Sequence, residues 1–278
     1  DTEDNVDLIT GQELARQGEV LPAVIHLLPV TSRPFFPGQA VPLLMEMEHW
    51  TSTMKAVKAS EHGIIGIVLA KAKTSETAKP ADFHGIGTAC RVHRVQPVEG
   101  RLQVLVECLQ RFRIEQILDK KTPFRARVHY FQEPAGAAKG DIKAYAMAII
   151  NTIKELVPLN PLYAEELRIF LDRLGPDDPS HLADFAASLT TANKEQMQEV
   201  LEAVELLPRM EKVLLLLNNE LELARAQHEI RKSVEDRMEG QQREFFLREQ
   251  LKSIRKSWVW KRTTAPRNWR NFGSAWSS

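Results

Sequence analysis

The chain has 278 residues, of which 43% are hydrophobic and 27% charged, so it is long and apolar enough to form two domains with buried cores. Its 37 basic residues balance 37 acidic ones, which excludes a global charge that would attract nucleic acid or an anionic membrane, and no basic patch is evident before residue 257. Two cysteines exclude a disulfide scaffold, and the apolar runs are too short to span a membrane, so we expect a soluble, cytoplasmic protein.

Residues 1–22 are the first predicted segment, an acidic flexible tail. Residues 1–19 carry six acidic side chains against one basic side chain, Arg16, and few large apolar residues. Such a segment cannot bury enough apolar surface to offset the entropy lost on ordering. It also lacks the basic and then apolar layout of a signal peptide.

Residues 23–133 have the pattern of a β-rich lobe, in which short apolar or alternating runs are broken by Pro and Gly. In the clearest run, apolar residues alternate with Arg125, Arg127 and His129. The predicted strands are 24–30, 41–45, 64–70, 86–95, 102–109, 111–118 and 124–130, with a short helix over 51–60 and a hairpin loop over 96–100.

Residues 134–207 shift to the 3.6-residue period of a helical bundle. Asn160-Pro161 and Asp178-Pro179 each pair a capping residue with a proline at the first helical position, and Asn193 with Gln196 forms a variant of the capping box. The predicted helices cover 141–157, 161–174, 180–189 and a fourth segment that begins after residue 193.

Residues 208–256 are predicted to form one long helix, because only Gly240 interrupts the pattern after Pro208. At 1.5 Å per residue this helix would span roughly 70 Å, more than the width of a small domain. Two interpretations stay open: a helix lying on its own domain, and a projecting coiled-coil or connector arm. The candidate self-association residues approximate a heptad seam and its flanks: Ile230, Val234, Met238, Phe245, Phe246 and Leu251.

Residues 257–278 depart from this pattern, with four of the five tryptophans, four basic residues and no acid. One interpretation is an RNA-binding tail, in which Trp side chains stack on bases and Arg side chains contact phosphates. We favour out-of-frame translation, because a nucleotide string for this segment, read one base earlier, encodes a plausible continuation of the charged helix. The chain would then be the truncated remnant of a longer protein.

The sequence offers no catalytic, cofactor-binding or metal-ligating residues. No Gly-Lys pair is present for a phosphate-binding loop, and the histidines lack the His-Glu-x-x-His spacing of a zinc site. Gly85-Ile86-Gly87 lacks the third glycine of a dinucleotide fingerprint. Cys90 and Cys108 lie in strand patterns and are interpreted as paired buried thiols rather than metal ligands with His93. We therefore expect a binding or assembly module.

Three segments carry the patterns of one family. The first joins residues 25–30 to Phe35-Phe36-Pro37-Gly38 and Pro42-Leu43, the second joins Gly85-Ile86-Gly87-Thr88-Ala89 to residues 105–114, and the third is residues 241–252. Together they resemble the amino-terminal domain of the Lon family of ATP-dependent proteases, over about residues 24–256. Two positions depart from the family pattern: Cys108 replaces a glycine, and Thr31-Ser32-Arg33-Pro34 stands where an Arg-Asp pair is usual.

The resemblance implies an α+β fold, in which an amino-terminal β-rich PUA-like lobe is followed by an α-helical bundle and one long C-terminal helix. In the family this helix leads to an ATPase ring and a Ser-Lys protease domain, and neither is present in this sequence. ATP and magnesium are therefore implied only for the missing ATPase module, with no cofactor in this chain.

The resemblance further implies a non-catalytic substrate-recognition and oligomerisation module in protein quality control. Its partners would be unfolded or damaged proteins and self or full-length Lon subunits, with no membrane partner and with nucleic acid disfavoured. Adaptable apolar side chains suit such a surface, although we favour a core role for the same residues. The candidate substrate-binding residues are Phe35, Phe36, Met45, Met47 and Trp50.

Three alternatives stay open. A freestanding RNA-binding protein would use the PUA-like lobe and the basic tail, and its binding would depend on salt. A free-acting hydrolase would lose turnover on substitution of one Ser or Cys. A regulatory fragment would co-assemble with full-length Lon and alter its activity.

Overall fold

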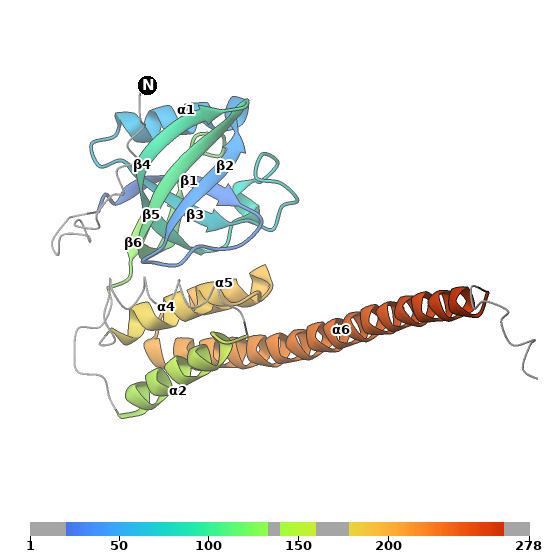
Figure 1. Ribbon diagram of the computed structural model, residues 1–278. Coiled ribbons are helices and arrows are strands. Elements are labelled where there is room, and N and C mark those ends of the chain that lie inside the picture. Colours follow the sequence, from blue (N-terminus) through green and yellow to red (C-terminus); the bar gives the residue numbers. More distant parts are fainter. Residues whose placement is uncertain (1–20, 133–139, 160–177, 264–278) are drawn as a thin grey trace, which may run out of the picture. The chain divides into compact units, whose positions relative to one another are not determined.

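The computed structural model describes residues 21–132, 140–159 and 178–263, and the chain divides into two compact units, residues 1–224 and residues 225–278 (Figure 1). Strands come first in the described chain and helices follow, which confirms the predicted α+β fold. The elements are β1 (Val24–Val30), β2 (Ala40–Glu46), α1 (Met47–Ala59), β3 (Ile64–Leu69), the 3-10 helix η1 (Pro80–Asp82), β4 (Ile86–Val98), β5 (Arg101–Ile117), β6 (Phe124–Tyr130), α2 (Gly140–Leu156), α4 (Pro179–Leu189), α5 (Lys194–Glu202) and α6 (Leu206–Thr263).

The strands form one sheet in the order β2-β5-β4-β3-β1-β6, which closes because β5 also pairs with β6 (Figure 1). Only β1 and β3 run parallel, since a crossover through β2 and α1 separates them in sequence. Alternate residues of β6 are buried, as the sequence predicts for residues 124–130. These side chains and those of β1 and β3 fill the barrel interior and form the first core.

The longest strand, β5, differs from the prediction, because it joins the two strands predicted over 102–109 and 111–118 into one continuous strand. Its first half pairs with β2, from Glu46↔Arg101 to Ala40↔Glu107, and its second half pairs with β6. The hairpin loop before it is shorter than predicted, since β4 continues to Val98. Only Glu99 and Gly100 turn, with φ of 47° and 78°, the positive values that a two-residue hairpin turn requires.

Helix α1 packs against the barrel and begins four residues before the predicted helix. Its buried residues, Trp50, Thr53, Met54 and Val57, recur at the spacing of one helical face. This face is part of the barrel core, so tertiary packing extends the helix into Met47 and its neighbours.

The helices after the barrel form the second core, to which α2, α4, α5 and the first part of α6 contribute. Two predicted caps are confirmed. The Asp178 carboxylate accepts hydrogen bonds from the backbone N–H groups of Ser180 and His181, both at 3.1 Å, and Asn193 and Gln196 form the reciprocal bonds of a capping box. The helix predicted after Asn160 lies outside the described residues.

Helix α6 runs from Leu206 to Thr263 and therefore begins two residues before the predicted helix and passes both Gly240 and Lys256. Pro208 is tolerated because the first turn of a helix has no backbone acceptor for its missing N–H. The predicted boundary at residue 257 does not end the helical backbone, and residues 264–278 lie outside the described part. None of the described helices is both long enough and apolar enough to cross a membrane.

Candidate functional site

The five residues predicted to bind substrate do not form an accessible surface. Phe35, Phe36, Met45 and Trp50 are buried, and Met47 is half-buried against the barrel core. A buried side chain cannot capture a passing chain without local opening of the fold. The burial of these residues agrees with the core role favoured for them from the sequence rather than with a substrate surface.

Phe36 connects the barrel to the helices. Although it precedes β2, its fully buried ring packs in the second core together with Ile86 of β4. Polar contacts surround this apolar joint. Gln198 donates to the carbonyl of Ile86 at 3.0 Å, Arg33 donates to the carbonyl of Ser188 at 3.1 Å, and Lys194 donates to the carbonyl of Thr31 at 3.3 Å. The barrel and the helices of the first unit therefore share one interface.

A buried charge cluster lies at the same interface. Arg111 of β5 binds the carboxylate of Asp184 on α4 with both terminal nitrogens, one of them at 2.7 Å to Oδ2. Arg209 of α6 lies 3.6 Å from Asp184 Oδ1 and donates to the hydroxyl of Ser180 at 2.8 Å. All three charged side chains are at most 2% exposed. One carboxylate thus joins β5, α4 and α6.

Sequence analysis missed this cluster. Arg111 belongs to a segment that carries the family resemblance, but no role was assigned to it. The available signal was Asp184, the single acid among the buried residues of α4, most of which are apolar. A buried acid requires a cationic or hydrogen-bonding partner, but the sequence does not identify which residue supplies it.

The two cysteines form the predicted pair of buried thiols. Cys90 and Cys108 are cross-strand partners whose sulfurs lie 3.4 Å apart inside the barrel. Burial, followed by the neighbouring Cys108, raises the pKa of the Cys90 thiol well above its usual value, which disfavours the nucleophilic thiolate. The described residues contain no group of three His, Cys, Asp or Glu side chains that could hold a metal ion.

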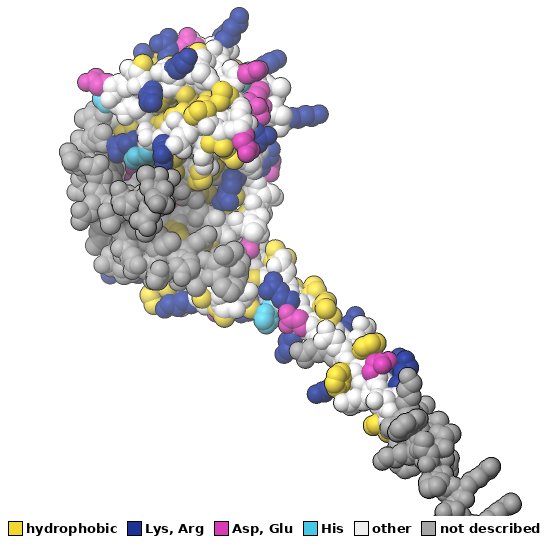
Figure 2. Space-filling view, turned by 45° about the horizontal axis from the view of Figure 1, so that its top comes forward, with side chains coloured by type: hydrophobic (Ala, Val, Ile, Leu, Met, Phe, Trp, Pro, Cys, Tyr) yellow, Lys and Arg dark blue, Asp and Glu magenta, His cyan; other side chains and the backbone are white. Residues whose placement is uncertain are grey.

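The described part of the second unit is a helix whose surface carries exposed apolar side chains (Figure 2). The six predicted self-association residues are all exposed. Together with Leu247 and Ile254, their exposed fractions run from 49% to 68%: Ile230, Val234, Met238, Phe245, Phe246, Leu247, Leu251 and Ile254. Large exposed apolar patches on monomers mark binding surfaces, so this surface is the main candidate site.

Seven of these apolar side chains fall into two rows on different sides of the helix, and Phe246 lies between the rows. At about 100° per residue, Ile230, Val234, Met238 and Phe245 share one side, here called the upstream row. Leu247, Leu251 and Ile254 share another side, about a third of a turn away, here called the downstream row. A straight partner that covers the upstream row therefore leaves the downstream row accessible.

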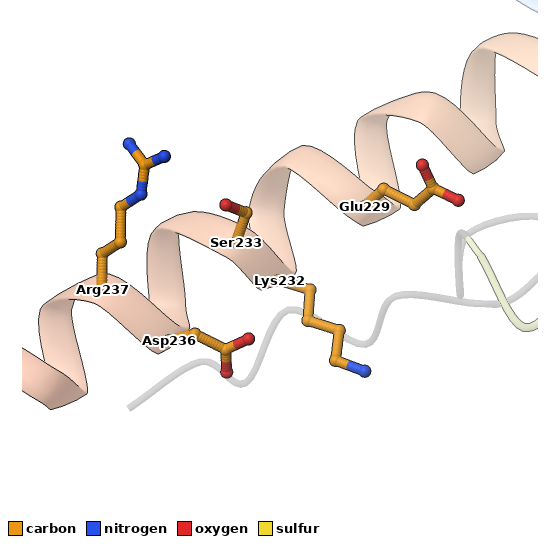
Figure 3. Close-up of a pocket in the computed structure, with 5 residues that line it drawn as sticks. All are labelled: Glu229, Lys232, Ser233, Asp236 and Arg237. Carbon is orange, nitrogen blue, oxygen red and sulfur yellow. The ribbon is translucent and has the colours of Figure 1, made fainter.

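A charged face lies about a third of a turn from the upstream row, on the side of the helix that the downstream row continues. Glu229, Lys232, Ser233, Asp236 and Arg237 line a shallow hollow of about 400 Å³, and Figure 3 shows their side chains fanning out rather than converging on one point. Catalysis by acid and base requires side chains that reach a common reacting atom. This face therefore has the character of the solvated side of an interaction helix.

The barrel carries a basic surface that the sequence analysis did not find. The exposed residues of β6 are Arg125, Arg127 and His129, here called the basic row. Strand pairing places His26 of β1 beside Arg125, and Arg113 of β5 beside His129. The alternation in β6 was visible in the sequence, but the register that adds residues from β1 and β5 was not.

The end of the basic row adjoins an open hollow of about 700 Å³ lined by His26, Asp119, Lys120, Lys121 and Arg125, with Thr122 and Pro123. Asp119 pairs with Arg125 at 2.5 Å, and this hydrogen bond lowers the pKa of the Asp119 carboxyl. Partial burial and then the Arg125 charge lower the pKa of His26. Arg125 therefore contributes to both shifts, although burial has the larger effect on His26.

Comparison with known families and proteins adds to this geometry. The family model described as the ATP-dependent protease La (Lon) substrate-binding domain matches residues 24–219. "Lon protease 2" of Hydrogenovibrio crunogenus is 44% identical over 247 residues, which cover 89% of this chain and 28% of that protein. "Lon protease" of Protochlamydia amoebophila is 38% identical over 257 residues, covering 91% of this chain and 31% of that protein.

A solved structure shares the fold. The "N terminal domain of Mycobacterium avium complex Lon protease" superposes with a TM-score of 0.55 at 22% identity, covering 70% of this chain and 98% of that one. The chain spans less than a third of the length of the two relatives named above. The shared region is therefore the amino-terminal recognition part of those proteins rather than their whole length.

Proposed function

Since the chain belongs to the family of Lon substrate-binding domains, we propose that it recognises unfolded or damaged protein segments and self-associates, without catalysing a reaction itself. The observation that carries the proposal is the exposure of apolar side chains on residues 230–254. Its partners are then unfolded polypeptides and other subunits of Lon type. We expect no ATP or magnesium to bind this chain, because the family places both in a module that this sequence does not contain.

Recognition of unfolded segments is assigned to the first unit, where the family model matches. Four of the five candidates are buried there and Met47 is half-buried, so other apolar side chains must make the contact. Leu44 is the most exposed large apolar side chain of the barrel, at 63%, and it lies on β2, which pairs with β5 alone. Val98 at the end of β4 is also exposed. Exposed apolar groups beside a strand edge suit an extended, non-native segment.

Self-association is assigned to the upstream row of the second unit. Its four side chains have no partner within residues 225–254, where every described side chain is exposed. An identical helix from a second copy offers the same apolar row and buries both. Association through this row leaves the downstream row free for a further contact.

The recognition half is tested by binding of a fluorescent, permanently unfolded polypeptide, carboxymethylated at its cysteines. We expect Leu44→Ser to weaken binding about fivefold, the loss for roughly 1 kcal/mol of apolar contact. Lys55→Ser, an exposed change on α1, is the matched control and should leave the affinity unchanged.

Two results would contradict the recognition half. One is equal affinity for the unfolded polypeptide and for its native, folded form. The other is equal binding by Leu44→Ser and Lys55→Ser. Turnover of the polypeptide by the chain alone would instead support the hydrolase alternative.

A further inference from the structure

The basic row is an electrostatic surface that the proposed function does not use. Arg125, Arg127 and His129 are exposed on one side of β6, with Arg113 beside them on β5. Among the described residues, Asp119 is the one acid that pairs with this row, and none of the described carboxylates pairs with Arg127. Positive charges gathered on one strand repel each other and favour an anionic partner.

The same chain contains a segment of opposite charge. Residues 1–19 hold Asp1, Glu3, Asp4, Asp7, Glu13 and Glu19 against Arg16. Six acids against one base give this segment a net charge of −5, which makes it the most acidic stretch of its length in the chain. Residues 1–19 lie outside the described residues, but residues 22 and 23, through which the segment joins the fold, are described.

The entry point lies beside the basic row. The carbonyl of Ala23 accepts a hydrogen bond from the backbone N–H of Val128 at 2.9 Å, and the carbonyl of Pro22 accepts one from the Tyr130 hydroxyl at 2.8 Å. Residues 22 and 23 therefore run alongside β6. Residues 22 and 23 lie at the end of β6 that carries His129, and Glu19 precedes Pro22 by three positions in the sequence.

The acidic segment is long enough to return over the row. From residue 125 to residue 129 a strand extends about 13 Å at roughly 3.3 Å per residue. A chain of 19 residues reaches up to about 60 Å when extended. Because both partners belong to one chain, their effective concentration is of millimolar order, which compensates for weak individual charge contacts.

We propose that the acidic amino-terminal segment, residues 1–19, docks on the basic row of its own chain. The contact is electrostatic and reversible, so it weakens as salt screens the charges. It shields the row from other polyanions, which bind only by displacing the segment. This inference goes beyond the proposed function and does not depend on it.

The test places a nitroxide spin label on the segment of the full chain through Asn5→Cys. Cys90 and Cys108 are buried, so the introduced thiol is the reactive one. In about 10 mM salt, where charges act over about 30 Å, the backbone amide signals of residues 125–130 should lose most of their NMR intensity. In about 1 M salt the intensity should return. The same protein with its nitroxide reduced to the diamagnetic form serves as the intensity reference.

A charge variant makes the test specific. Arg125→Gln with Arg127→Gln should restore the intensity at low salt, whereas Lys55→Gln with Lys58→Gln, two exposed changes on α1, should not. Undiminished signals at low salt, or loss that the row variant leaves unchanged, would overturn the proposal.

Two other occupants would also overturn it. If the signals weaken only when spin-labelled and isotope-labelled copies are mixed, the segment binds a second copy. The second outcome concerns a single-stranded RNA oligonucleotide and a variant in which the six amino-terminal acids are replaced by amides. If the RNA binds the full chain and this variant equally tightly, the segment does not compete for the row, and the row is a nucleic-acid surface.

Discussion

Large apolar side chains are mostly buried in the first unit, whereas those described in the second unit are exposed. In the first unit Phe36 is fully buried and joins two parts of the fold, whereas in the second unit Phe245 is 68% exposed. Isolated helices are marginal in water, and the ion pairs Arg248–Glu244 and Lys252–Glu249 on α6 contribute only a few tenths of a kcal/mol each. The apolar residues of the first unit build the fold, and those of the second unit are available to another molecule.

The sharpest test of this difference is one substitution made in both units. Phe36→Ala should cost about 3–5 kcal/mol of unfolding free energy, because it opens a cavity between barrel and helices. Phe245→Ala should change it by no more than about 0.5 kcal/mol. Urea denaturation of both variants at low protein concentration measures this contrast. Equal losses of unfolding free energy in the two variants would contradict the difference between the units.

The buried charge cluster should produce the next largest effect. Asp184→Asn leaves Arg111 and Arg209 buried beside a neutral group, which should cost about 3 kcal/mol. Asp141→Asn, a change at an exposed acid on α2, is the matched control. Thermal unfolding followed by circular dichroism compares them, and similar melting temperatures would show that the cluster does not hold the first unit together.

A helix cap in the first unit should give a smaller, pH-dependent effect. Asp178→Ala should cost about 1 kcal/mol, because two backbone N–H groups lose their acceptor. The hydrogen bond from His181 lowers the pKa of the Asp178 carboxyl. The contribution is therefore complete above the unfolded pKa of about 3.9 and declines as the pH falls through the lower folded pKa. In urea titrations from pH 7 to pH 3, the stability gap between variant and parent should begin to narrow below about pH 4, and a gap that widens there would contradict the assignment.

The smallest effect is expected in the second unit. Glu244→Gln removes one ion pair between positions four residues apart and should reduce stability by about 0.3 kcal/mol, with the loss disappearing at high salt. Helical content from circular dichroism at low and high salt measures it. A loss above about 1 kcal/mol would mean that this exposed pair is part of an interface.

Local structure was largely predictable from the sequence. Strands β1 and β6 match the predicted ranges, and Asp178 and Asn193 cap the helices that they were expected to cap. These features depend on the alternation of apolar and polar residues and on capping side chains, and both involve residues that are close together in the sequence. The buried thiol pair was also foreseen, because it follows from the hairpin that joins β4 and β5.

Long-range features were not predictable in the same way. Phe36 looked like a candidate for an exposed surface because nothing in its neighbours shows that the second core receives it. The partners of Asp184 lie 73 residues before it in β5 and 25 residues after it in α6, as Arg111 and Arg209. The neighbours of the basic row, His26 and Arg113, could be placed only from the register of three strands. Such sites are formed by residues far apart in the sequence, and local sequence patterns do not show which of these residues meet in the fold.

The most direct test of the account is sedimentation velocity of the full chain over a wide range of concentrations. The sedimentation coefficient should rise with concentration for the unmodified chain and for the control Ser233→Lys with Gln250→Lys. It should stay at the monomer value for Val234→Lys with Met238→Lys, which places the same added charge in the upstream row. A coefficient that never changes, or that rises equally in both variants, would contradict self-association through this row.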